Sequence, residues 1–161
     1  MGSADFARRL RHEIYRHFAR EAEAPTVGWL AGRLKTTIFQ VEQGLRMLAD
    51  AREIVLLPGM SRIWMAHPFS SGATPFPVEC CGRHYFAPCA WDALGIAALL
   101  GKDSDTITHC PDCGVEMDVR VRDGELSDVL FGPDRQEVSP DEAVVHFSVP
   151  ARYLWDDIGF T

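Results

Sequence analysis

The sequence lacks an apolar run of the roughly 20 residues that a membrane-spanning helix needs. Its N-terminus is amphipathic and charged rather than signal-like, so we expect a cytoplasmic protein that does not associate with membranes. Basic residues are few, since 16 Lys and Arg stand against 23 Asp and Glu and the formal net charge is −7. With 47% hydrophobic and 24% charged side chains over 161 residues, the composition indicates a globular protein of one domain or two small ones.

The chain also lacks the even set of cysteines that a disulfide framework needs. It has five, all between residues 80 and 113, and only one Cys-x-x-Cys pair. We therefore expect free thiols or a bound metal in a reducing compartment. The five are Cys80, Cys81, Cys89, Cys110 and Cys113.

Charge is distributed unevenly along the chain. Residues 1–68 hold 10 Lys and Arg against 7 Asp and Glu, a net charge of +3. Residues 69–161 hold 6 against 16, a net charge of −10. This difference predicts two domains with a boundary near residue 68.

Residues 1–68 read as three helices and a hairpin. The predicted helices are 4–22, Val27–Leu34 after the N-cap Thr26, and a third helix capped by Thr36 or Thr37. Ile54–Leu57 and Arg62–Met65 alternate like hairpin strands. This order is typical of a winged helix-turn-helix. The would-be recognition helix, however, offers a single Arg and no Lys, so we expect a scaffold rather than a DNA reader.

Residues 69–161 read as a small, mostly antiparallel sheet around one buried helix, an α+β arrangement. The predicted strands are Val78–Cys81, Arg83–Phe86, Thr106–His109, Val115–Arg122, Leu126–Phe131 and Ala143–Val149. Asp123-Gly124 is a strong hairpin turn. The helix lies within Tyr85–Gly101, with Pro88 expected in its first turn and Gly101 as its stop. Its nearly uniform apolar composition predicts burial on all sides.

Cys89 and Asp92 fall three residues apart at the start of this helix, on one face. The N-terminal end of a helix favours anions, so the spacing predicts that Cys89 ionises readily. A thiolate beside a carboxyl that can hold a proton is a soft-metal ligand next to a proton donor. The structural alternative is a small buried cysteine with Asp92 as a capping residue.

The segment Cys110-Pro-Asp-Cys113-Gly has the form of a zinc knuckle. A structural zinc site needs two further ligands, which Cys80, Cys81, His84 or His109 could supply only if the sheet brings 80–84 beside 110–113. The alternative is a tight turn with two free thiols.

Three segments carry a resemblance to a known family: CAWDALGIAALLG at 89–101, the preceding MAHPFS and the following THCPDCG. Together they resemble the organomercurial (alkylmercury) lyases. The resemblance implies that Cys89 and Asp92 match the catalytic cysteine and aspartate, and that Cys110 matches a family cysteine regarded as structural. It also implies a winged-helix-like scaffold at the N-terminus. The second catalytic cysteine of the family has no secure match here, and Cys113 and the Cys80–Cys81 pair lie outside its pattern.

The resemblance implies a protein of mercury resistance that cleaves carbon–mercury bonds. Cys89 would bind an organomercurial, and a second thiolate would raise the coordination of mercury. Asp92 would protonate the carbon, and no cofactor would be required. The second thiol would come from Cys80, Cys81, Cys110 or Cys113, or from residues beyond Thr161. The product ion Hg(II) would pass to cellular thiols or a mercuric reductase.

Two alternatives to this activity remain at the level of the sequence. One is a relative that binds mercury or zinc through its thiols without turnover. The other is a winged-helix DNA-binding regulator whose cysteines sense metal.

Overall fold

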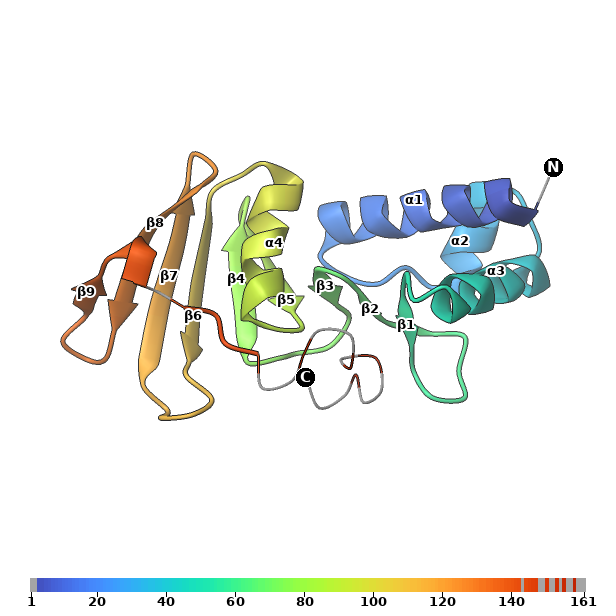
Figure 1. The fold of residues 1–161 in the computed structure, drawn as a ribbon. Coiled ribbons are helices and arrows are strands. Elements are labelled where there is room, and N and C mark those ends of the chain that lie inside the picture. Colours follow the sequence, from blue (N-terminus) through green and yellow to red (C-terminus); the bar gives the residue numbers. More distant parts are fainter. Residues whose placement is uncertain are drawn as a thin grey trace. The chain divides into compact units, whose positions relative to one another are not determined.

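The computed structural model describes residues 3–142, 144–147, 150, 153, 155 and 158. The chain divides into two compact units, Met1–Gly72 and Ala73–Thr161. Helices and antiparallel strands make up both units (Figure 1), and the fold is α+β as predicted. Among the described residues, no helix is both long enough and apolar enough to cross a membrane.

Three helices begin the first unit: α1 (Ser3–Glu21), α2 (Val27–Leu34) and α3 (Ile38–Asp50). Two of the predicted N-caps are confirmed. The Thr26 hydroxyl accepts a hydrogen bond from the Trp29 backbone N–H at 3.1 Å, and Thr37 forms a capping box with Gln40. Such caps satisfy N–H groups that a first helical turn leaves without partners. Helices α2 and α3 therefore begin where these threonines predicted.

Short antiparallel strands complete the first unit: β1 (Val55–Leu56), β2 (Ile63–Ala66) and β3 (Phe69–Ser70). The ring of Phe69 stacks on Phe18 of α1, with the centroids 5.2 Å apart. The core takes the inward faces of all three helices and includes Leu10, Ile14, Phe18, Leu30, Val41 and Leu45.

Helix α3 exposes apolar side chains where a DNA-reading helix would carry cations. Ile38 is 56% exposed and Phe39 is 62% exposed. The guanidinium of Arg46 lies 3.9 Å from the Glu42 carboxylate of the same helix. A helix face without clustered cations does not bind the phosphates of a DNA backbone. The scaffold role of this unit stays a prediction.

The second unit is built on an antiparallel sheet whose described strands run in the order β5-β4-β6-β7-β8-β9. Their bounds are β4 (Phe76–Cys80), β5 (Arg83–Ala87), β6 (Ser104–His109), β7 (Glu116–Arg122), β8 (Glu125–Phe131) and β9 (Gln136–Val138). The predicted turn at Asp123-Gly124 joins β7 to β8, with both residues at positive φ. Strand β4 lies between β5 and β6, which are therefore parallel to each other.

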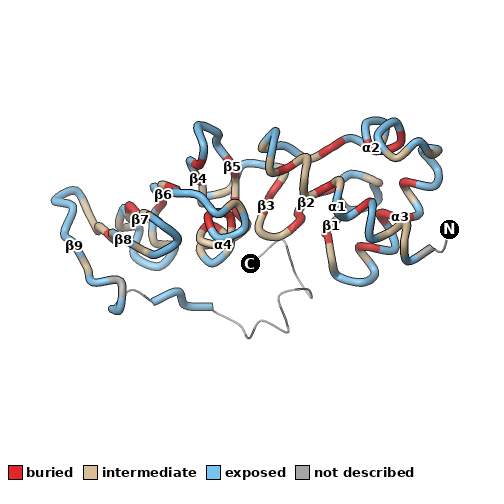
Figure 2. Tube along the Cα trace, turned by 90° about the horizontal axis from the view of Figure 1, so that it is seen from above, coloured by how far each residue is buried: buried red, intermediate tan, exposed pale blue. Residues whose placement is uncertain are grey.

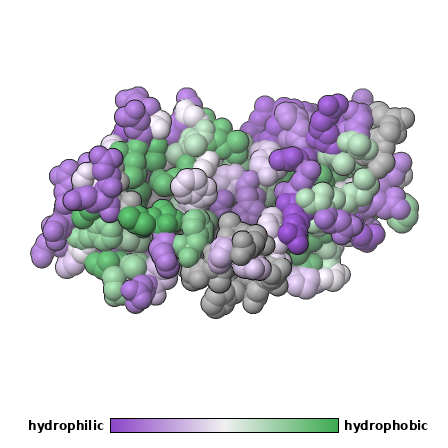
Figure 3. Space-filling model, viewed as in Figure 1, coloured by the Kyte–Doolittle hydropathy of each residue, from purple (hydrophilic) through white to green (hydrophobic). Residues whose placement is uncertain are grey.

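Helix α4 (Ala90–Leu100) packs against β4 and β5 (Figure 1). Ala93, Ile96 and Ala97 form its buried face, whereas Trp91 is 63% exposed and Leu99 is 53% exposed. In Figure 2, α4 accordingly carries both buried and exposed segments. The prediction of burial on all sides is therefore wrong, because in the part of the chain that the structure describes the sheet packs on one face of the helix. Figure 3 shows hydrophobic side chains gathered over this helix and the adjoining strands. Gly101 ends the helix in the left-handed conformation (φ 60°), as predicted.

The C-terminal part of the sheet departs from the sequence prediction. Strand β9 was not foreseen, and the strand predicted over Ala143–Val149 is wrong for residues 144–147, which form no strand and are exposed. Residues 143, 148 and 149 of that prediction lie outside the described part. Val144 is 83% exposed and Phe147 is 41% exposed, so neither apolar side chain is buried as a strand of the core would bury it.

Candidate active site

Cys89 lies at the junction between β5 and α4. Strand β5 ends at Ala87, and Pro88 follows it outside the helix rather than in the first turn as predicted. A proline has no N–H to give to a strand ladder and restricts the residue before it to extended backbone, so it ends the strand here. Cys89 then becomes the N-cap of α4, with φ −150° and ψ 176°.

The thiol of Cys89 is bonded to Asp92 rather than used in capping. The side chain makes no capping hydrogen bond. Its Sγ donates to Oδ2 of Asp92 at 3.2 Å. Asp92 is the third residue of the helix, the position from which an acid can reach back toward the cap. The two side chains that the spacing placed on one face are thus in contact, and both are partly exposed.

The prediction that Cys89 ionises readily is wrong. Burial raises the pKa of Cys89 to about 11 from its ordinary 9.0, and the charge of Asp92 adds to the increase. Hydrogen bonds from the backbone N–H groups of Asp92 and Trp91 lower the pKa, as expected at a helix start, but desolvation outweighs them. Cys89 is therefore a thiol at neutral pH, and Asp92 is the acceptor hydrogen-bonded to it.

Cys110 lies at the same end of the sheet as Cys89. Cys89 comes after the last residues of β5, and Cys110 comes directly after β6. The hydroxyl groups of Thr74 and Thr108 donate to backbone carbonyls at this end of the sheet, each at 2.6 Å. Because neighbouring strands lie about 4.8 Å apart, the backbones of β5 and β6, on either side of β4, are roughly 10 Å apart here.

Cys110 and Cys113 occupy a tight turn. The Gly114 N–H donates to the Cys110 carbonyl at 2.8 Å, and the Cys110 N–H donates to the Val115 carbonyl at 2.8 Å. Hydrogen bonds from the backbone N–H groups of Cys113 and Asp112 lower the pKa of Cys110, and the Cys113 side chain contributes further. Cys110 is partly exposed and Cys113 is exposed. This turn thus offers a thiol that ionises more readily than Cys89.

Cys80 and Cys81 lie at the opposite end of the same strands. Cys80 pairs with Ser104 at the start of β6, whereas Cys110 follows its last residue. At about 3.4 Å per residue, the length of β6 separates the two cysteine pairs by on the order of 20 Å. Register therefore does not bring 80–84 beside 110–113. In the part of the chain that the structure describes, no three His, Cys, Asp or Glu side chains gather as a metal site.

Trp91 is the site residue that sequence reasoning missed. It is 63% exposed, on the first turn of α4 between Cys89 and Asp92. The apolar composition of the helix predicted burial for it. The signal that could have found it is an aromatic residue inside the Cys-x-x-Asp motif itself.

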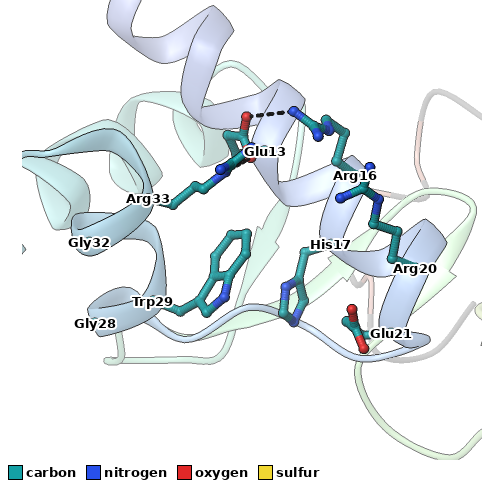
Figure 4. Close-up of a pocket in the computed structure, with 9 residues that line it drawn as sticks. All are labelled: Glu13, Arg16, His17, Arg20, Glu21, Gly28, Trp29, Gly32 and Arg33. Atoms are coloured by element: carbon teal, nitrogen blue, oxygen red, sulfur yellow. Dashed lines mark hydrogen bonds and ion pairs between the residues drawn. The ribbon is translucent and has the colours of Figure 1, made fainter.

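A separate pocket of about 490 Å³ lies in the first unit between α1 and α2 (Figure 4). The rings of His17 and Trp29 meet edge to face within it, with centroids 4.4 Å apart. Glu13 pairs with Arg16 at 3.1 Å and with Arg33 at 2.9 Å. Arg16 and Arg33 are thus already paired with Glu13. The described residues that line this pocket include none of the five cysteines.

The profile of the family described as alkylmercury lyase (MerB) matches residues 69–161, more than half of the chain. The chain belongs to the alkylmercury lyase family. Among solved structures it is similar to "Crystal structure of the mercury-bound form of MerB2", with a TM-score of 0.61 and 25% sequence identity.

That likeness covers 79% of this chain and 66% of the mercury-bound lyase, so the chain spans just under two thirds of that protein. No curated protein sequence matches the chain. The family match begins at Phe69 and contains Cys89, Asp92 and all the other cysteines.

Proposed function

We propose that this protein cleaves carbon–mercury bonds by protonolysis, with Cys89 as the mercury-binding sulfur and Asp92 as the proton carrier. The observation that carries the proposal is the hydrogen bond from the Cys89 thiol to the Asp92 carboxylate at the head of α4. Membership of the alkylmercury lyase family supports the same reaction class.

The raised pKa of Cys89 gives the reaction its proton. In the resting protein the proton sits on Sγ and points at Asp92. When mercury bonds to Sγ, the thiol becomes a far stronger acid and the proton passes to the carboxylate over the existing hydrogen bond. Asp92 then delivers that proton to the carbon as the carbon–mercury bond breaks. General acid catalysis from a positioned carboxyl contributes roughly 10²–10⁴-fold.

A second sulfur completes the balance of the reaction. The overall change is R–Hg⁺ + 2 R′SH → R–H + Hg(SR′)₂ + H⁺, so one thiol proton reaches carbon and the other reaches solvent. Soft thiolates hold mercury in preference to oxygen ligands, and the two electrons of the carbon–mercury bond stay with carbon. No oxidant or reductant enters this balance.

We assign the second sulfur to Cys110. It follows β6 at the same end of the sheet as Cys89, and its lowered pKa makes it the more readily ionised thiol. The resemblance alone implies a structural role for this cysteine, so the assignment rests on topology. Cys80 and Cys81 are at the far end of the strands and are not suited to share an ion with Cys89.

The exposed indole of Trp91 is suited to receive the organic group of the substrate. Trp91 lies in the first turn of α4, directly before Asp92 in the chain, and is 63% exposed, and aromatic rings bury large apolar areas. Cellular thiols or a mercuric reductase would then take over the Hg(II) product by thiol exchange.

Phenylmercury with excess small-molecule thiol is the direct test, with benzene measured by gas chromatography. The proposal predicts benzene from the wild-type protein and none above background from Cys89→Ser. A relative that only binds mercury would retain phenylmercury on the protein and form no benzene, which would overturn the lyase proposal. Cys110→Ser abolishing benzene while Cys113→Ser retains it would support the assignment of the second sulfur. Equal turnover by these two variants would overturn that assignment alone.

A further inference from the structure

Cys80 and Cys81 form a pair of neighbouring thiols that the lyase reaction does not use. Their Sγ atoms are 3.8 Å apart. Cys80 ends β4 and is buried, whereas Cys81 is exposed in the turn between β4 and β5. One sulfur is therefore held firmly by the core and the other is free to move in solvent.

The turn that presents Cys81 favours a different residue. Cys80 pairs with Arg83, so Cys81 and Gly82 are the two central residues of the hairpin, and their φ values are +56° and +68°. A two-residue turn with positive φ at both positions favours Asn, Asp or Gly at the first and Gly at the second. A cysteine at the first position is under backbone strain. Its presence there indicates that the sulfur contributes something other than turn formation.

Adjacent cysteines are better suited to share an ion than to form a disulfide. A disulfide usually spans Cα atoms 4.4–6.8 Å apart, whereas neighbouring residues on a trans peptide are about 3.8 Å apart. A metal ion bonded to two sulfurs at about 2.3 Å each accepts any sulfur separation up to roughly 4.6 Å. The observed 3.8 Å separation of the two Sγ atoms lies within that range.

The surroundings select the kind of ion. Zinc requires four ligands in a structural site, and among the described residues no third His, Cys, Asp or Glu joins the pair. A pair of thiolates with no further ligand binds soft cations that accept two-coordinate sulfur ligation, such as Hg(II) or Cu(I). Burial raises the pKa of Cys80, and Cys81 and Asp103 raise it further while Lys102 offsets only part of the increase, so a metal ion must displace the thiol proton.

We propose that Cys80 and Cys81 form a second site of the protein, which binds one soft, two-coordinate metal ion between the two sulfurs. For Hg(II) the balance is Hg²⁺ + 2 R′SH → Hg(SR′)₂ + 2 H⁺, and for Cu(I) it is Cu⁺ + 2 R′SH → Cu(SR′)₂⁻ + 2 H⁺; in each, two sulfur–hydrogen bonds break and two sulfur–metal bonds form. No electrons are transferred. The side chain of Cys81 swings outward by roughly 1 Å to accommodate a linear ion.

The site is independent of the lyase reaction. Strand β5 separates the turn from Ala87 and Cys89 by on the order of 14 Å or more, so one ion cannot bridge Cys81 and Cys89. The site therefore remains if the proposed activity fails, and the activity remains if the site fails.

Mercuric chloride serves as the probe, with the full chain carrying Cys89→Ser, Cys110→Ser and Cys113→Ser, so that only the neighbouring pair remains. We expect one Hg(II) per chain after desalting in the presence of excess glutathione, because two tethered thiols compete better than single ones. Retention of much less than one Hg(II) per chain would overturn the proposal.

Cys81→Asn in the same background is the matched variant. Asn suits the positive φ of the turn, so this variant keeps or gains thermal stability and any loss of binding is not a failure to fold. We expect at least a roughly tenfold loss of retained Hg(II). Equal retention by Cys81→Asn would show that Cys80 alone holds the ion and would overturn the paired site. In the otherwise wild-type chain, Cys81→Asn should leave benzene formation unchanged, and a fall in turnover would contradict the independence of the two sites.

Discussion

Replacing Asp92 by Asn should change the reactivity of Cys89 and the activity of the protein in opposite directions. The pKa of Cys89 is raised to about 11 from 9.0, first by burial and then by the charge and hydrogen bond of Asp92. At pH 7 this shift leaves roughly 100-fold less thiolate than an ordinary cysteine has. Asn removes the charge and leaves the burial, so it recovers part of that factor, about tenfold.

The assay is alkylation of Cys89 by iodoacetamide at pH 7, followed by mass spectrometry of the peptide that contains it. Asp92→Asn should alkylate about ten times faster than wild type, because the alkylating species is the thiolate. The same variant should lose benzene formation by roughly 100-fold or more, because an amide has no proton of suitable acidity to deliver. Asp134→Asn, at an exposed carboxylate elsewhere in the second unit, is the control and should change neither rate. Slower alkylation of Asp92→Asn, or unchanged benzene formation, would refute the reasoning.

Three further substitutions test the site and the packing around it. Trp91→Ala should lower kcat/KM for phenylmercury roughly fivefold and that for methylmercury little, because only the larger group covers the indole; equal losses would contradict this role. Asp118 is 4% exposed, and although burial acts to raise its pKa, hydrogen bonds from Arg120 and Arg135 hold the pKa below its ordinary value. Its stabilisation is therefore present above about pH 4 and lost as pH falls through the folded-state pKa. Asp118→Asn should cost about 1 kcal/mol in urea unfolding at pH 7 and progressively less as the pH is lowered below about 4, and a cost that does not fall with pH would contradict it. Gly44→Ala would place a Cβ 2.7 Å from the buried Leu10 and should lower the unfolding free energy by about 1–3 kcal/mol; an unchanged melting temperature would exclude this crowding.

Local signals predicted the helices and most of the strands. Thr26 and Thr37 located two helix starts, and Gly101 located one helix end, because capping is decided within a few residues of sequence. Burial was harder to predict. Helix α4 is apolar on every face, but the fraction of its surface that is buried depends on which other elements pack against it. Local sequence does not show this tertiary packing.

The Cys89–Asp92 contact was predictable from spacing, whereas the ionisation of Cys89 was not. A helix start lowers the pKa of a thiol and burial raises it, and the balance depends on how much of the chain surrounds the sulfur. Whether the cysteines could form one metal site also depended on the register of the strands, which the sequence does not show. Because Cys80 pairs with Ser104 at the start of β6, Cys80 and Cys81 lie at the opposite end of the sheet from Cys110 and Cys113. That pairing joins segments far apart in the sequence, so no local pattern predicts it.

The most direct test of the account is a single-turnover reaction of the protein with one equivalent of phenylmercury and no added thiol. Native mass spectrometry and benzene analysis would follow the same sample. The account predicts that the wild type releases about one benzene per chain and keeps bare mercury, while Asp92→Asn keeps intact phenylmercury on Cys89. Benzene release by Asp92→Asn at the wild-type rate would contradict the claim that Asp92 carries the proton from sulfur to carbon.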